Sequence, residues 1–167
     1  MKYFLSFIGL LSLSLYLSAE EIPKREINTG DIAPNIILRD LNNKLIICKD
    51  ILKEKPILIN FFFTGCAPCK KEIPELENLN DKYKDKIQIF LIATDKEGYE
   101  AVKPYVDKMK IRMDVLIDKY SDVVKEFNII KYPTVYIIDR NRKVRYYQSG
   151  YNDDNILKIE NIIKNLR

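Results

Sequence analysis

The stretch FFFTGCAPCKKEIPE, residues 61–75, places Cys66 and Cys69 where an apolar run gives way to a helical pattern. The apolar run, PILINFFF at residues 56–63, lacks strict alternation, which predicts a strand buried on both faces and central in a parallel sheet. From Pro68 onward, apolar residues recur at three- and four-residue spacing, which predicts a helix packed on that sheet. The chain therefore contains a strand-to-helix unit with a CxxC pair at its turn.

The pattern on either side of this unit predicts a single α/β domain with a mixed sheet. Strands are expected at residues 35–39, 44–48, 87–93, 115–117, 134–138 and 144–148. Helices are expected at residues 99–109, interrupted by Pro104, at 121–127, and at the C-terminus after a cap at Asn152 or Asp153. The first two strands form a hairpin around the turn residues Asn42 and Asn43. Residues 20–34 form a polar lead-in, and the domain spans residues 35–167.

The N-terminal residues 1–19 have the pattern of an export signal. Lys2 precedes an apolar run that ends before Ser18 and Ala19. The run is shorter than the ~20 residues that span a membrane comfortably, so we expect cleavage after Ala19 or, alternatively, retention as a membrane anchor. Both alternatives place the domain in a periplasmic or other extracytoplasmic compartment, where disulfides can form.

The composition excludes several classes of function. The chain has no histidine, which excludes Ser-His-Asp and Cys-His catalysis and histidine-ligated metals. Its net charge of +4 is spread along the sequence without a basic block, so nucleic acid is not an expected partner.

The two cysteines of the CxxC pair suit thiol-disulfide exchange. At a helix start, Cys66 faces unpaired N–H groups and the positive end of the helix dipole, and Lys70 and Lys71 add positive charge, so its thiol should ionise readily. Cys69, one turn later, is placed to resolve a mixed disulfide. A static disulfide or a metal site are the alternatives, although two thiols alone cannot complete a zinc site. The third cysteine, Cys48, is expected to be a small buried apolar residue at the end of a strand, with regulation or intermolecular pairing as the alternative.

Three segments together resemble the TlpA/ResA/DsbE group of thioredoxin-like proteins. They are GDIAPNIILRD at residues 30–40, FFFTGCAPCKKEIPE, and KYPTVYIIDRNRKV at residues 131–144. The resemblance runs from Gly30 to the C-terminus. It implies a thioredoxin fold with an N-terminal hairpin and a helix-strand insertion between Ile87 and Phe127. It also implies a thiol-disulfide oxidoreductase that reduces particular exported proteins, such as apocytochrome c.

The resemblance also assigns roles to individual residues. Cys66 matches the attacking thiol and Cys69 the resolving thiol. Pro133 matches a cis-proline, and the Tyr132–Pro133 peptide is expected to face the cysteines and bind the substrate backbone. Glu72 matches an acidic residue that carries protons for the thiols, a role that the amide at Asn60 cannot take.

One departure concerns the residue before the first cysteine. Most relatives have tryptophan there, whereas this chain has Gly65 and no tryptophan. We therefore expect the usual aromatic flank of the site to be missing. The reaction of the relatives is then a better guide to this chain than their choice of substrate.

These observations predict an exported oxidoreductase that cycles Cys66 and Cys69 between dithiol and disulfide and reduces a partner protein. It needs no organic cofactor or metal; its electrons come from a membrane thiol donor, and a monomer is the default. The alternatives are an oxidant that donates disulfides and a non-catalytic binding or scaffold module of the same fold. A peroxidase is disfavoured because the sequence lacks the Pro-x-x-x-Thr-x-x-Cys pattern.

Overall fold

The structure, a computed structural model, describes residues 25–166. The predicted export signal at residues 1–19 lies outside this range. Among the helices within residues 25–166, none has the length and apolar character that crossing a bilayer requires.

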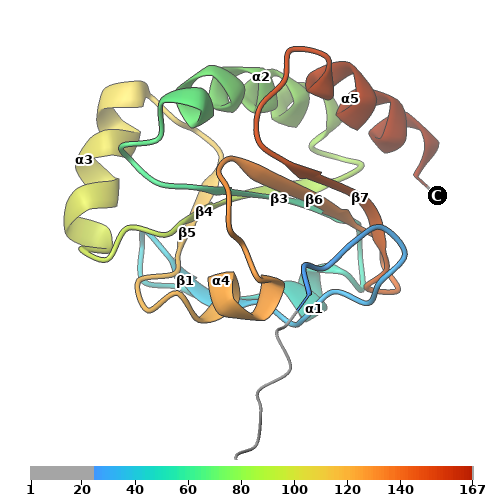
Figure 1. Cartoon of the computed structure of the whole chain (residues 1–167), viewed down its shortest axis with the longest axis horizontal. Helices are drawn as coiled ribbons and strands as arrows, with labels where there is room; N and C mark the ends of the chain where they lie inside the picture. Colours follow the sequence, from blue (N-terminus) through green and yellow to red (C-terminus); the bar gives the residue numbers. More distant parts are fainter. Residues whose placement is uncertain (1–24, 167) are drawn as a thin grey trace, which may run out of the picture.

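A seven-stranded mixed sheet forms the centre of the molecule, in the order β2-β1-β5-β4-β3-β6-β7. Figure 1 shows this sheet between two layers of helices. The strands are β1 (Ile37–Asp40), β2 (Leu45–Ile47), β3 (Ile57–Phe62), β4 (Gln88–Ala93), β5 (Asp114–Ile117), β6 (Thr134–Ile138) and β7 (Val144–Ser149). The helices are α1 (Cys48–Ile51), α2 (Ala67–Tyr83), α3 (Tyr99–Met109), α4 (Asp122–Phe127) and α5 (Asn155–Asn165). The expected α/β architecture with a mixed sheet is confirmed.

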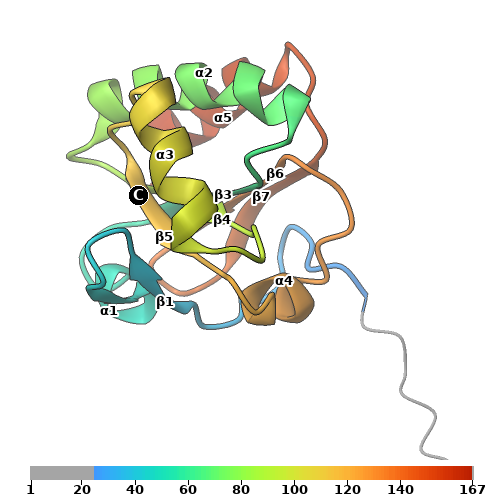
Figure 2. The same cartoon turned by 90° about the vertical axis from the view of Figure 1, so that its left-hand side faces the viewer.

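The helices divide between the two faces of the sheet, as Figures 1 and 2 show: α2, α3 and α5 cover one face, and α1 and α4 cover the other. Each face has its own apolar core. Leu58 and Phe62 point into the core under α2, while Ile59 and Phe61 point into the core over α4. Because side chains alternate along a strand, β3 is buried on both faces, as its unbroken apolar pattern predicts.

The neighbours of β3 differ from the expectation in one respect. It pairs in parallel with β4 but antiparallel with β6, so it is central in a mixed sheet rather than in a parallel one. Helix α4 lies between β5 and β6 in the chain, and β6 then enters the sheet beside β3 in the opposite direction and continues into the hairpin with β7.

The hairpin and the insertion that the family resemblance implies are both present. Strands β1 and β2 form an antiparallel hairpin, and β1 pairs antiparallel with β5. Helix α3 and strand β5 lie between β4 and α4 in the chain, and β5 extends the sheet beyond β4. The insertion therefore joins the N-terminal hairpin to the rest of the sheet.

Three local expectations are wrong. Helix α3 runs through Pro104 without interruption, because the proline removes only the bond to the carbonyl of Glu100, a solvent-exposed residue in the first turn. Helix α5 begins later than expected, with Asp154 at its N-cap, because residues 152–155 form a turn first. Cys48 is the first residue of α1 and not the last of a strand.

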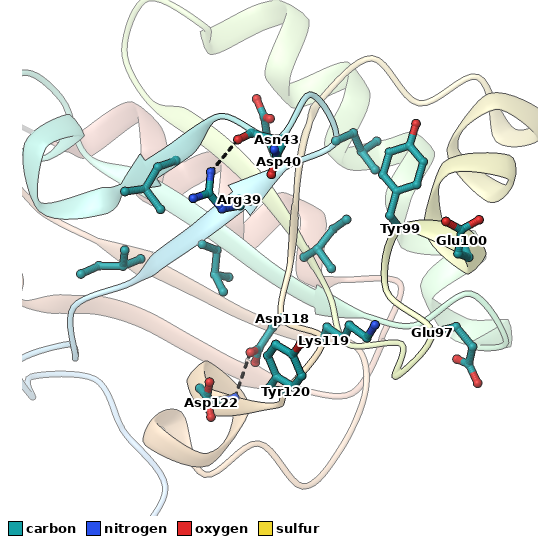
Figure 3. Close-up of a pocket in the computed structure, with 15 residues that line it drawn as sticks. Arg39, Asp40, Asn43, Glu97, Tyr99, Glu100, Asp118, Lys119, Tyr120 and Asp122 are labelled. Carbon is teal, nitrogen blue, oxygen red and sulfur yellow. Dashed lines mark hydrogen bonds between the residues drawn. The ribbon is translucent and has the colours of Figure 1, made fainter.

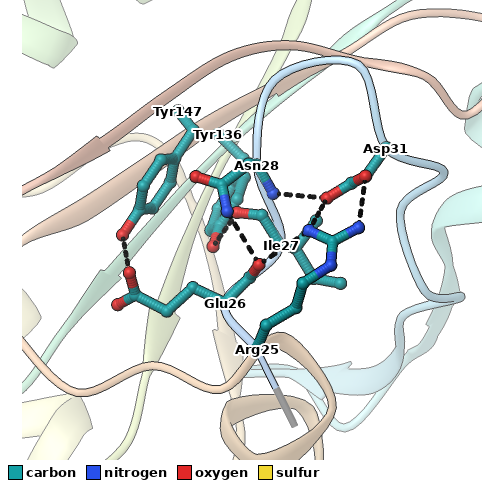
Figure 4. A network of polar contacts seen from close by, with 7 residues as sticks. All are labelled: Arg25, Glu26, Ile27, Asn28, Asp31, Tyr136 and Tyr147. Carbon is teal, nitrogen blue, oxygen red and sulfur yellow. Dashed lines mark hydrogen bonds and ion pairs between the residues drawn. The ribbon is translucent and has the colours of Figure 1, made fainter.

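Residues 25–34 of the lead-in are held against β6 and β7, as Figure 4 shows. Arg25 and Asp31 form a bidentate ion pair with distances of 2.6 and 2.7 Å. The Tyr136 hydroxyl donates to the carbonyl of Ile27 at 3.1 Å, and the Tyr147 hydroxyl donates to Glu26 at 2.8 Å. The contacts of Glu26 and Ile27 therefore hold the lead-in against strands β6 and β7.

Candidate active site

The cysteine pair lies at the carboxyl end of β3, where the chain enters α2. Cys66 is the N-cap of α2, and Cys66 and Cys69 form a disulfide with their Cα atoms 5.3 Å apart. The backbone N–H of Cys69 donates to the Cys66 sulfur at 3.2 Å. Cys66 is 3% exposed and Cys69 is 0% exposed. Of the two residues, Cys66 thus keeps a small exposed fraction, whereas Cys69 is enclosed by the core.

The electrostatics at the start of α2 favour a negative charge on Cys66 once the disulfide is reduced. The N–H of Cys69 that points at the sulfur and the helix dipole both stabilise a thiolate. The first turn of α2 contains no acidic residue, and Lys70 and Lys71 lie there, exposed to solvent. The arrangement suits the nucleophile of a thiol-disulfide exchange.

A hydrogen-bonded loop holds the approach to Cys66. The Thr64 hydroxyl donates to Asp95 at 2.6 Å, and its backbone N–H donates to the same carboxylate at 3.1 Å. The backbone N–H of Cys66 donates to the carbonyl of Phe63 at 3.0 Å, which closes a tight turn. The loop that positions the Cys66 sulfur is therefore anchored to Asp95, which follows β4.

Glu72 lies one turn after Cys69 and is completely buried. Burial raises the pKa of its carboxyl to about 7, against the opposing effect of a hydrogen bond from Asn60. That bond, from Asn60 Nδ2 to Glu72 Oε2, is 2.6 Å long. A carboxyl with a pKa near neutrality can both accept and release a proton under ordinary conditions.

The register of the sheet brings a third polar side chain toward Glu72. Asn60 of β3 lies opposite Val135 of β6, and Val135 lies opposite Gln148 of β7. Residues directly opposite one another share a face, so Asn60 and Gln148 both point toward α2. The Gln148 amide opposes the rise in the pKa of Glu72, and Glu72 is one cause, after burial, of the raised pKa of Tyr146.

Sequence reasoning missed Gln148. Its only signal in the sequence is a polar residue in a strand, and that signal does not identify what the side chain faces. In the structure, Gln148 accepts a hydrogen bond from the Tyr146 hydroxyl at 2.5 Å and donates to the carbonyl of Gly150 at 2.7 Å. The β3-β6-β7 register alone places it beside Glu72.

The Tyr132–Pro133 peptide bond is cis, as the family resemblance implies. Thr134, the next residue, begins β6 and pairs with Phe61 of β3. Since Phe61 lies five residues before Cys66, this pairing brings the cis peptide to the same end of the sheet as the cysteines. The structure thus gathers the sequence-predicted residues Cys66, Cys69, Tyr132 and Pro133 at the carboxyl end of β3, with Glu72 behind them.

An aromatic pair lies beside Gly65, the residue that precedes the first cysteine. The rings of Phe63 and Tyr132 meet edge to face, with centroids 5.3 Å apart. A Cβ atom at Gly65 would lie 3.1 Å from the Phe63 ring, so that ring folds over Gly65. The chain thus has no aromatic residue directly before Cys66, as expected, and the Phe63 ring, from two positions before Gly65, lies over Gly65 instead.

The third cysteine lies away from this site. Cys48 is 2% exposed and belongs to the core over α1 and α4, on the other side of the sheet from Cys66 and Cys69. Burial raises the pKa of its thiol to about 12, so it stays protonated at neutral pH. The expectation of a small buried apolar residue is confirmed.

A hollow of about 660 Å³ lies between the β1-β2 hairpin, the start of α3 and the segment after β5 (Figure 3). Neither Cys66 nor Cys69 lines it. Two of its acidic residues already hold local structure: Asp118 accepts from the backbone N–H of Asp122 at 2.9 Å, and Asp40 accepts from that of Asn42 at 2.8 Å. The hollow is separate from the redox pair.

The geometry agrees with comparisons with known proteins. A model of the AhpC/TSA family matches residues 29–147. The chain belongs to the AhpC/TSA family. Within this family it is similar to the thiol-disulfide oxidoreductase ResA of Bacillus cereus, with 38% identity over 138 residues, 82% of this chain and 76% of that protein. It is also similar to the thioredoxin-like protein YneN of Bacillus subtilis, with 30% identity, 86% of this chain and 84% of that protein.

Solved structures of similar proteins confirm the thioredoxin fold of this family member. The thioredoxin domain of a thiol-disulfide oxidoreductase from Bacteroides vulgatus superposes with a TM-score of 0.73 at 27% identity, covering 83% of this chain and 99% of that one. Peroxidoxin BcpB from Mycobacterium tuberculosis superposes with a TM-score of 0.75 at 19% identity, covering 85% and 99%, which shows the fold alone. With its CxxC pair and its ResA relatives, the chain is a thiol-disulfide oxidoreductase.

Proposed function

We propose that this oxidoreductase works outside the cytoplasm and reduces disulfides in particular exported proteins, of which apocytochrome c is one candidate. The observation that carries the proposal is the Cys66–Cys69 pair at the N-terminus of α2 with buried Glu72 one turn behind it. The export pattern of residues 1–19 supports the compartment. A monomer is proposed as the working form.

The reaction begins with the reduced chain. The Cys66 thiolate attacks one sulfur of the partner's disulfide, so that the partner's S–S bond breaks and a mixed disulfide with Cys66 forms. The partner's second sulfur leaves as a thiolate and takes a proton from water. The N–H of Cys69, which points at the Cys66 sulfur, favours the thiolate that starts this step.

Cys69 completes the exchange. Its thiol gives its proton to Glu72 and attacks the Cys66 sulfur; the bond between Cys66 and the partner breaks, and the Cys66–Cys69 disulfide forms. The partner's remaining sulfur leaves and is protonated, so two electrons pass from the chain to the partner. Reduction of Cys66–Cys69 for the next cycle requires a dithiol donor, which we propose to be a membrane thiol protein.

The proposed roles of the remaining site residues follow from their positions. The Tyr132–Pro133 peptide, just before the start of β6 and beside the carboxyl end of β3, would pair with the backbone of the bound partner. The Asn60 amide holds Glu72 through its bond of 2.6 Å, which orients the carboxyl within the core.

Trapping of the mixed disulfide tests the exchange. The reduced Cys69→Ser chain, mixed with insulin as a disulfide-bonded protein, should form a covalent adduct that is visible on a non-reducing gel and lost on reduction. The Cys66→Ser chain is the matched control and should form none. Absence of an adduct with Cys69→Ser would favour the binding-module alternative.

The reduction potential of the Cys66–Cys69 couple tests the direction of transfer. A value between about −270 mV and about −200 mV supports a reductant, because thioredoxin and glutaredoxins lie there. A value near about −120 mV would instead make the protein a disulfide donor.

A further inference from the structure

The three consecutive phenylalanines at the end of β3 have different environments. Phe61 and Phe62 are completely buried, one in each apolar core. Phe63, the first residue after the strand, is 38% exposed, although alternation would turn it toward the same face as Phe61. Its ring instead lies at the surface, in the turn that leads to Cys66. The fold does not use this ring to fill its core.

Phe63 lies in the same turn as the nucleophile, with its ring over the residue that precedes Cys66. The carbonyl of Phe63 accepts from the N–H of Cys66, so the two residues close one turn. The ring folds over Gly65, where an added Cβ would lie 3.1 Å from it. The backbone of Gly65 is not in the left-handed region, so its conformation does not require glycine. The absence of a side chain at Gly65 instead leaves room for the Phe63 ring.

The same ring contacts the opposite side of the site. The rings of Phe63 and Tyr132, the residue before Pro133, are nearly perpendicular, and their centroids are 5.3 Å apart. Such pairs are stabilising and hold both rings in one geometry. The two rings thus join the loop before Cys66 to the loop before β6, and Phe63 contributes the exposed apolar part of the pair.

We propose that Phe63, held by Tyr132, is a specificity-determining residue that receives an apolar side chain next to the reacting cysteine of the partner. The inference rests on the proposed function, since it requires that Cys66 attack a partner's disulfide. Its physical basis is that covering the exposed part of the ring stabilises the complex most when the facing side chain is also apolar, because both apolar surfaces then leave water and no polar group is desolvated. A partner with a polar residue at that position loses this contact and keeps the chemistry.

Three disulfide substrates test the assignment. Two are peptides of equal length and charge with one disulfide, which differ only in carrying leucine or serine beside the attacked cysteine; the third is 2-hydroxyethyl disulfide, which has no flanking residue. The wild-type chain should reduce the leucine peptide with the highest kcat/KM. In Phe63→Ala, kcat/KM for the leucine peptide should fall roughly tenfold, the effect of removing an apolar contact at an interface. The other two substrates should change by less than about twofold, within the range of a neutral contact.

A control and a relocated ring distinguish the contact from a structural effect. Leu45→Ala removes a side chain of comparable exposure, 48%, on β2, which lies four strands from β3, and should leave the preference unchanged. Gly65→Phe in the Phe63→Ala background returns an aromatic ring beside Cys66 and should restore the leucine preference. The reduction potential of the Cys66–Cys69 couple should stay the same in all of these variants.

Two outcomes overturn the assignment. Equal losses on all three substrates in Phe63→Ala would show that the ring supports the structure of the loop, and an unchanged leucine preference would show that it does not contact the partner. Failure of the wild-type chain to reduce any of the three disulfides is a different result, which would overturn the proposed function and this assignment with it.

Discussion

Replacement of Glu72 by glutamine should remove a pH dependence of stability that the buried carboxyl imposes on the oxidised protein. Glu72 is completely buried in the core under α2, and burial raises its pKa from the ordinary 4.5 to about 7. A glutamine side chain has nearly the same shape, and its oxygen can still accept the hydrogen bond from Asn60. The substitution therefore removes the titration while keeping the packing.

The size of the effect follows from the pKa. The folded chain binds a proton at Glu72 more tightly than the unfolded chain, so the stabilisation is fully present below about pH 4.5 and is lost as the pH rises through about 7. This interval spans about 2.5 pH units, each equivalent to about 1.4 kcal/mol, which gives about 3 kcal/mol in all. Most of that loss should fall between about pH 5 and about pH 8.

Urea unfolding at these two pH values, with the disulfide intact, measures the effect. Far-UV circular dichroism is the suitable probe, because the chain has no tryptophan. Relative to wild type, Glu72→Gln should gain roughly 2–3 kcal/mol in unfolding free energy on going from the lower to the higher pH. Glu126→Gln, at an exposed glutamate of α4, is the matched control and should show no such gain. A Glu72→Gln difference that does not vary with pH would refute the reasoning.

Two further substitutions test hydrogen bonds made by carboxyl groups of α2, one within the site and one outside it. Asn60→Asp replaces the amide that donates to Glu72 at 2.6 Å by a second carboxylate, so the pKa of Glu72 should rise further. The pH at which disulfide reduction reaches half its maximal rate should then move up by at least about one unit. An unchanged pH profile would mean that Glu72 takes no proton in the rate-limiting step. Glu77→Ala removes the carboxylate that accepts from the backbone N–H groups of Arg112 and Met113 at 2.7 and 2.9 Å. Urea unfolding should show that the free energy of unfolding falls by about 1–3 kcal/mol. Glu77→Gln keeps an acceptor oxygen, so its free energy of unfolding should fall by less.

The strand-to-helix unit and its cysteines were predictable because the forces that produce them are local. The apolar run at β3 and the three- and four-residue spacing of apolar residues in α2 indicate which faces of the two elements are apolar. Burial of these apolar faces determines how the two elements pack. The N-terminal position of Cys66 on α2 follows directly, and with it the charge that the thiol experiences. The cis bond before Pro133 was accessible only through the family resemblance, since residue pattern alone does not distinguish cis from trans.

By itself, then, the sequence determined the α/β fold class, the position of the redox pair and the buried character of Cys48. The tertiary structure alone decided that Asn60 and Gln148, on strands far apart in the chain, both face Glu72, because the register of β3, β6 and β7 is a long-range pairing. It also decided that Phe63 turns to the surface and meets Tyr132, a contact between residues 69 positions apart in the chain. Patterns within a segment report which face is apolar, but only the pairing of distant segments determines which polar and aromatic side chains meet at the active site.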